Sequence, residues 1–142
     1  MFTPQHIVII CIFLQVGLTF WAIFSMGLQR VKSLKARETT LQDVALASDG
    51  YPDYVKPYQN NVKNQFETPV LLYALVLLSL ASGIANWGVA LGAALFIISR
   101  FIHRAVHVGA NDLRLRFNVF LGGLIGLAIG WLALGLGLLG VI

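Results

Sequence analysis

The feature that most constrains the fold is the separation of positive charge from four long apolar segments. All ten Lys and Arg side chains lie in two stretches, one between the first and second apolar segments and one around the gap between the third and fourth. The two ends of the chain and the short polar stretch near residue 85 carry none. Because positive flanks of membrane helices stay on the cytoplasmic side, this pattern predicts four transmembrane helices with both termini outside.

The composition also indicates that lipid is the main solvent of this chain. Of its 142 residues, 58% are hydrophobic and 11% are charged, whereas a soluble domain carries about a quarter charged residues. Four apolar segments with short connections leave no room for a second domain. We therefore expect residues 1–142 to form a single all-α domain, a bundle of four transmembrane helices.

The basic residues behind the net charge of +4 lie next to the predicted spans. Anionic lipid headgroups or an anionic substrate are the natural partners of such juxtamembrane charges. Membrane lipids are therefore expected partners of this chain, and nucleic acid is not.

Local signals place the four helices at about 4–28, 58–81, 87–107 and 113–139. Thr3 followed by Pro4 is typical of a helix start, and Gly109 of a helix end. The first segment is too long for a signal peptide, and its positive charges follow the apolar core, so we interpret it as a retained helix. Pro69 removes a hydrogen bond from the carbonyl of Gln65 and predicts a bend early in the second helix.

Three features inside the apolar segments are assigned to packing. Gln15 is expected to bond to a neighbouring helix, and the single cysteine, Cys11, to be an inert buried thiol. Gly122, Gly126 and Gly130 recur every four residues and allow another helix to approach closely.

Two clusters of polar side chains lie at membrane depth, each spaced to share one face of a helix. They are Asn60, Asn64 and Glu67 in the second segment and Arg100, His103 and His107 in the third. Such groups usually face the bundle interior, pair with one another or line a wet cavity. One interpretation is an ion pair between Glu67 and Arg100 that sets the register of two helices. The number of polar groups exceeds what registration requires, however, and favours a binding site for a small anionic molecule.

A metal site is the first chemical alternative for these residues. His103 and His107, four positions apart, could chelate a divalent ion with Glu67 as a third ligand. An isolated pair of this spacing is a weak motif, and no cysteine or further histidine lies nearby. We therefore predict no metal ligands.

The two clusters resemble motifs of the MAPEG family, the membrane-associated proteins of eicosanoid and glutathione metabolism. Asn64-x-x-Glu67, with a proline just beyond, is similar to the signature of the family's second helix. Arg100-x-x-His103-x-x-x-His107, followed by basic residues that open the next helix, is similar to the run in its third helix. The resemblance spans the whole chain, including the long first loop, residues 30–58, which either covers a site or is a solvated connection.

This resemblance implies a homotrimer that binds glutathione as a co-substrate between neighbouring subunits at the cytosolic face. The resemblance implies that Asn64, Glu67 and Arg100 line the glutathione site. We expect the other members of the two clusters, Asn60, His103 and His107, to contribute to it as well. The resemblance also implies that Arg114 or Arg116 lies near the sulfur as the catalytic cation. A cation there favours the thiolate over the thiol and so creates the nucleophile. A lipophilic small-molecule substrate would enter from the bilayer, between the first and fourth helices.

The chain departs from the family pattern at two of these positions. Asn60 stands where the helix-2 signature has Arg, and His107 stands where many members have Tyr. Lys56 or Lys63 could replace the missing cation, although a Lys does not reproduce the bidentate geometry of an Arg. With these departures the sequence resembles a divergent, bacterial-type branch of the MAPEG family. The resemblance implies a protein of the bacterial inner membrane. Its termini would be periplasmic, and the loops between helices 1 and 2 and between helices 3 and 4 would be cytoplasmic.

The function predicted from these features is that of a membrane-bound glutathione transferase or peroxidase acting on lipophilic electrophiles. The alternative is a non-enzymatic protein of the same fold that binds a lipid or an anionic metabolite. A transporter or channel is disfavoured, because no acidic residue lies in the middle of a span to mark an ion path.

Overall fold

The computed structural model describes residues 3–45 and 50–141, and these residues are helical wherever their structure is regular. The helices are α1 (Pro4–Lys35), α2 (Lys56–Gln65), α3 (Pro69–Ala81), α4 (Trp87–Val108) and α5 (Leu113–Leu138). Within this described part, four helical stretches are long and apolar enough to cross a membrane, with α2 and α3 together making the second. The prediction of an all-α, four-span membrane protein is confirmed.

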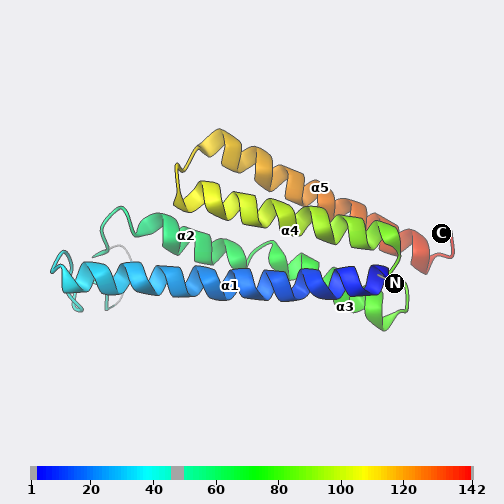
Figure 1. The fold of residues 1–142 in the computed structure, drawn as a ribbon, viewed down its shortest axis with the longest axis horizontal. Coiled ribbons are helices and arrows are strands. Elements are labelled where there is room, and N and C mark those ends of the chain that lie inside the picture. Colours follow the sequence, from blue (N-terminus) through cyan, green and yellow to red (C-terminus); the bar gives the residue numbers. More distant parts are fainter. Residues whose placement is uncertain (1–2, 46–49, 142) are drawn as a thin grey trace.

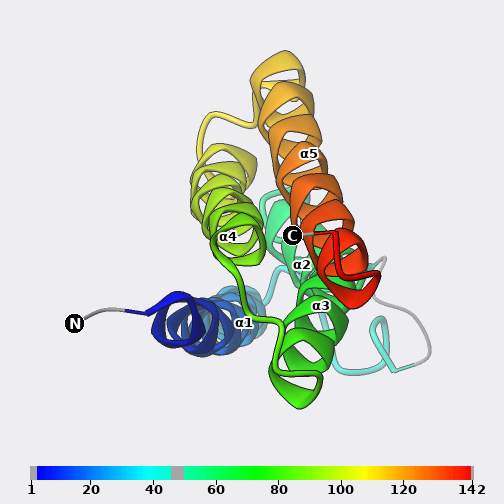
Figure 2. The ribbon, with the colours of Figure 1, turned by 90° about the vertical axis from the view of Figure 1, so that its right-hand side faces the viewer.

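The connections alternate between the two ends of the bundle (Figures 1 and 2). The start of α1, the turn between α3 and α4, and the end of α5 lie at one end. The segment after α1 and the connection between α4 and α5 lie at the other. We call this second end the basic end, because the two stretches that hold every Lys and Arg lie toward it.

The first helix extends beyond the predicted end near residue 28 and reaches Lys35. At 1.5 Å per residue its 32 residues span about 48 Å, more than the ~30 Å of a hydrocarbon core. The end of the apolar run marks where the chain leaves the lipid, and the helix continues into the polar region. It ends two residues before Arg37, whose φ of 58° lies in the left-handed region, and the Glu38 N–H donates to the Ser33 carbonyl at 3.1 Å.

The second span is broken, whereas the sequence predicted one bent helix over 58–81. The α2 helix ends at Gln65 and α3 begins at Pro69, so residues 66–68 are not helical. Pro69 occupies the first turn of α3, where its missing N–H is tolerated, but it cannot donate to the carbonyl of Gln65. The helical ladder is therefore interrupted at the membrane depth where the polar clusters lie.

The α4 and α5 helices pack through glycine. A Cβ added at Gly92 would lie 2.5 Å from the backbone nitrogen of Gly130 and 2.6 Å from the carbonyl oxygen of Gly126. The prediction of close approach is thus confirmed for these two glycines of α5. It is wrong for Gly122, which has no neighbour within 4 Å, while Gly123 faces α4 instead. A strict four-residue repeat drifts around a helix of 3.6 residues per turn, so only part of the repeat stays on one face.

The predicted burial of Cys11 and the predicted bond from Gln15 to a neighbouring helix are also confirmed. Cys11 is 3% exposed and belongs to the apolar core formed with Leu72, Leu75 and Phe96. Gln15 Nε2 donates to Gln65 Oε1 at 2.9 Å and so joins α1 to α2.

Candidate functional site

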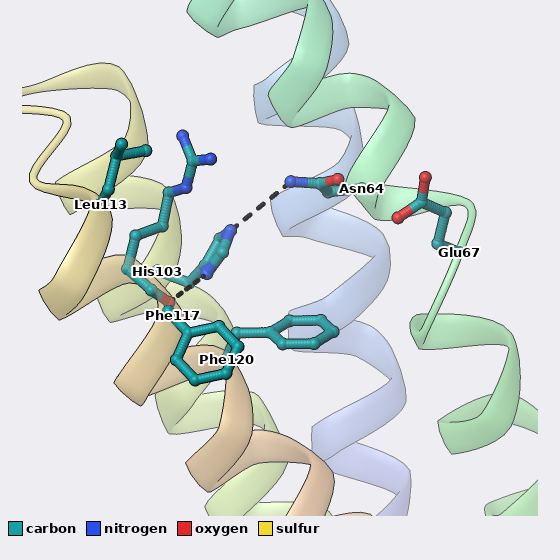
Figure 3. A pocket seen from close by; sticks show the side chains of 7 residues that line it. Asn64, Glu67, His103, Leu113, Phe117 and Phe120 are labelled. Atoms are coloured by element: carbon teal, nitrogen blue, oxygen red, sulfur yellow. Dashed lines mark hydrogen bonds between the residues drawn. The ribbon is translucent and has the colours of Figure 1, made fainter.

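A cavity of about 370 Å³ lies at the basic end, between α2, α4 and the start of α5. We call it the first cavity; its lining residues are Asn64, Glu67, His103, Leu113, Arg116, Phe117 and Phe120 (Figure 3). One wall is polar and comes from all three helices. The other wall is apolar and comes from α5 alone, because Leu113, Phe117 and Phe120 follow the i, i+4, i+7 spacing of one helix face.

A second cavity of about 260 Å³ shares Asn64, Glu67 and Arg116 with the first. It adds three polar side chains, Asn60, Lys63 and His107. The two cavities are therefore neighbours that share part of a polar wall, and the first also has an aromatic wall. A volume of a few hundred Å³ with a few convergent polar groups is typical of a small-molecule site.

Asn64 and the two histidines form a polar bridge between α2 and α4. The Asn64 side-chain Nδ2 lies 3.5 Å from His103 Nε2 and 3.4 Å from His107 Nδ1. His103 Nδ1 lies 3.3 Å from the backbone carbonyl oxygen of Arg116, which joins α4 to α5 (Figure 3). A carbonyl oxygen only accepts, so Nδ1 carries the proton, and in the neutral ring Nε2 is left to accept from Asn64.

Arg100 lies behind this wall and is not among the residues that line either cavity. It is 2% exposed, and its Nη2 donates to the backbone carbonyl of Asn64 at 2.8 Å. Its Nε and Nη1 have no hydrogen-bond partner among the described residues. Among the described residues no ion pair joins Arg100 to Glu67. The register of the two helices is therefore not set by the ion pair considered from the sequence.

The two candidate catalytic cations on α5 lie in different surroundings. Arg116 lines both cavities and is half-buried, and its Nη1 donates to Asn111 Oδ1 at 2.7 Å. Arg114 is exposed and lines neither cavity. Arg114 and Arg116 are two positions apart on one helix, so their side chains point in nearly opposite directions. The geometry therefore favours Arg116 as the cation that a bound anion would meet.

The two lysines considered for the missing family Arg also differ. Lys56 Nζ lies 2.7 Å from Asp53 Oδ1, in an ion pair outside both cavities. Lys63 lines the second cavity beside Asn60. A cation is thus present close to the departure from the family pattern.

The segment after α1 packs against α1 itself. Glu38 Oε2 accepts a hydrogen bond of 2.6 Å from the Tyr54 hydroxyl, and this bond raises the pKa of Tyr54. The Arg30 guanidinium lies 5.1 Å from the centre of the Tyr51 ring. Among its described residues, 36–45 and 50–55, none lines either cavity. These residues act as a connection along α1 rather than as a cover over the site.

A buried arginine and its partner were not predicted from the sequence. Arg104 is 2% exposed, and its guanidinium bonds to Asn61 Oδ1 and to Ser25 Oγ. A signal was available: Arg104 follows Arg100 by four positions and so shares its inward face. The apolar wall on α5 was missed as well, although its spacing is visible in the sequence.

The described part of the chain holds no group of three His, Cys, Asp or Glu side chains that could bind a metal ion. The two cavities are lined by amide and imidazole groups, the cations Arg116 and Lys63, the carboxylate of Glu67 and the apolar wall of α5. That set suits an anionic molecule with an apolar partner.

The fold and the cavity define a multi-pass integral membrane protein with a mixed polar and aromatic site at one end of the bundle. The chain belongs to the MAPEG family, whose family model matches residues 8–136, nearly the whole chain. The resemblance drawn from the two motifs is confirmed at the level of the family, which includes glutathione transferases and peroxidases besides other members. No curated protein and no solved structure matched the chain in the corresponding comparisons.

Proposed function

We propose that this protein binds glutathione, or a thiol of similar chemistry, at the basic end and reacts it with lipophilic electrophiles. The observation that carries the proposal is the composition of the first cavity. It combines a cation, Arg116, with polar groups on one wall and three large apolar side chains on the other. Membership of a family that includes glutathione transferases and peroxidases supports the same reaction class.

In this mechanism Arg116 stabilises the thiolate. A guanidinium beside a thiol lowers the pKa of the thiol, so the proton leaves to solvent and the sulfur becomes the nucleophile. In conjugation the thiolate forms a carbon–sulfur bond and the leaving group, where there is one, departs with the bonding electrons. In peroxide reduction the thiolate attacks one oxygen of the peroxide, the O–O bond breaks, and the other oxygen leaves as an alcohol after protonation by solvent. The sulfenic acid formed on the thiol then reacts with a second thiol, which gives the disulfide and releases water.

The remaining residues of the cavities bind and orient the two substrates. Asn60, Lys63 and His107 supply polar contacts for the charged ends of the thiol peptide. Leu113, Phe117 and Phe120 supply an apolar surface for the electrophile, which partitions into the bilayer. His103 is held by Arg116 and Asn64, so it fixes the spacing between the polar wall and α5.

The proposal includes a homotrimer in the bacterial inner membrane, with the basic end in the cytoplasm and the termini in the periplasm. The orientation follows from the positive-inside rule, and the trimer follows from the family resemblance. A cytoplasmic site has the reduced thiol pool on its own side of the membrane.

A non-enzymatic binding protein is the second candidate. It is favoured by Asn60, which stands where the family signature has Arg and removes a bidentate contact for a carboxylate. Such a protein would hold a lipid or an anionic metabolite in the same cavities without activating a thiol.

The deciding measurement is ultraviolet difference absorbance at the thiolate band, with the detergent-purified protein titrated with glutathione. The proposal expects a saturable signal, and none with S-methylglutathione, which has no thiol to ionise. Absence of the signal in a protein that still binds glutathione or co-purifies with a lipid would favour the second candidate.

A further inference from the structure

We propose that Arg104 is a positioning residue that clamps α2 against α1 and α4 and so holds the polar wall of the two cavities in place. Its effect on a thiol substrate rests on the proposed function, whereas its effect on α2 does not. Arg104 lines neither cavity, so any influence on the site passes through α2.

The α2 helix packs through polar side chains. Its ten residues, KPYQNNVKNQ, are mostly polar, and its buried residues are Gln59, Asn61 and Gln65. A helix normally docks by burying an apolar stripe, and α2 has no such stripe. Its position therefore depends on hydrogen bonds made by buried polar side chains.

The guanidinium of Arg104 contacts two other helices. Arg104 Nη1 donates to Asn61 Oδ1 on α2, and Nη2 donates to Ser25 Oγ on α1 at 2.8 Å. Nη2 also lies 3.4 Å from the Trp21 carbonyl oxygen, and the guanidinium carbon lies 4.3 Å from the centre of the Trp21 ring. A single side chain of α4 thus contacts both α1 and α2, in a planar geometry that Lys does not reproduce.

Asn61 lies among the residues of α2 that line the cavities. It is fully buried and follows Asn60 directly, and it precedes Lys63 and Asn64. These three neighbours line the cavities. A rotation of α2 about its axis, or a slide along α4, would move all of them together. The bond between Gln15 and Gln65 fixes the end of α2, and Arg104 fixes its middle.

The test uses Arg104→Ala and Asn61→Ala in the full-length protein in detergent. Hydrogen exchange of residues 56–65, measured without any thiol, reads the order of α2 directly. We expect both variants to lose protection there, while α4 and α5 keep theirs. With glutathione, we expect the half-saturation concentration of the thiolate signal to rise between about 10- and 100-fold, because small misplacements of binding groups have large effects.

Conservative variants separate geometry from charge. Arg104→Lys keeps the charge without the planar fork, and we expect it to resemble Arg104→Ala. Asn61→Asp keeps the acceptor, and we expect it to resemble the unmodified protein. In the double variant Arg104→Ala/Asn61→Ala, the fold-increase in the half-saturation concentration should be well below the product of the increases in the two single variants. The reason is that each substitution removes the same contact.

Asn86→Ala is the matched control for a general loss of stability. Asn86 also makes a partly buried hydrogen bond between helices: its Nδ2 donates to the Ala133 carbonyl of α5 at 3.2 Å. This bond lies at the opposite end of the bundle. The substitution should leave the exchange of residues 56–65 and the thiolate titration unchanged.

Unchanged exchange in residues 56–65 in Asn61→Ala, or equal loss of protection throughout all helices, would overturn the inference. If the unmodified protein gives no thiolate signal, the proposed function fails. The exchange measurement still decides whether Arg104 positions α2.

Discussion

Arg100 of α4 donates a hydrogen bond of 2.8 Å to the backbone carbonyl of Asn64, one residue before α2 ends. The carbonyls at the end of a helix lack an intrahelical partner and carry partial negative charge. The break before Pro69 leaves this carbonyl available, and the buried guanidinium satisfies it. The side chain of the same Asn64 contacts His103 and His107, so Arg100 holds the residue on which the polar wall is centred.

Replacing Arg100 by Met should weaken glutathione binding much more than it changes the free energy of unfolding. The carbonyl of Asn64 would lose a donor, which costs about 1–3 kcal/mol, but two unpaired buried nitrogens would disappear with the charge. We expect the free energy of unfolding to change by about 2 kcal/mol or less, and glutathione binding to weaken strongly. Chemical unfolding in mixed micelles and isothermal titration calorimetry measure the two effects. A collapse of stability with unchanged affinity per folded molecule would contradict this assignment.

Arg116→Ala and Arg114→Ala should differ in activity. We expect Arg116→Ala to abolish the thiolate absorbance and to lower kcat by about 100- to 1,000-fold, the usual effect of removing one electrostatic stabiliser. Arg114 is exposed and lines neither cavity, so Arg114→Ala should retain both signals. Conjugation of a lipophilic aryl halide, followed by absorbance, is a suitable assay. Equal losses in the two variants would mean that general surface charge, rather than a cation in the cavity, is responsible.

Gly92→Ala and Gly122→Ala test the contact between α4 and α5. At Gly92 a new Cβ would meet backbone atoms of Gly126 and Gly130 at 2.5–2.7 Å, so the helices must separate. We expect Gly92→Ala to destabilise the protein by about 1–3 kcal/mol. Gly122 has no neighbour within 4 Å, so its replacement should be neutral or stabilise by up to about 1 kcal/mol through helix propensity. Midpoints of unfolding in mixed micelles would show the difference, and a destabilised Gly122→Ala would point to another helix on that face.

The bond between Gln15 and Gln65 should contribute modestly to stability. Hydrogen bonds between membrane helices average about 0.6 kcal/mol in double-mutant cycles, with a maximum of about 1.7 kcal/mol. We expect Gln15→Leu to destabilise the protein, because Gln65 Oε1 loses its donor. The double variant Gln15→Leu/Gln65→Leu should recover part of this loss, because no buried acceptor is left unpaired. Strictly additive effects of the two substitutions would show that the residues do not interact.

The sequence by itself determined the class of fold, the number of spans and the common end at which the basic residues meet. A chain exposed to lipid must form long apolar helices with positive charge at one side. Both properties can be recognised from composition and charge distribution without any tertiary information. The two polar clusters were also visible, because side chains spaced three and four residues apart on a helix share a face. Family membership followed from the same residues.

The tertiary structure decided which of these residues meet one another. It distinguished Arg116 from Arg114 and Lys63 from Lys56, and it placed Arg100 behind the wall of the cavity rather than in it. It also brought Arg104 to Asn61, 43 residues away in the chain. Helical periodicity gives the direction of a side chain on its own helix, but not the rotation and depth of one helix against another. Those depend on close packing at Gly92, Gly126 and Gly130 and on hydrogen bonds across helices, which exist only once the bundle has formed.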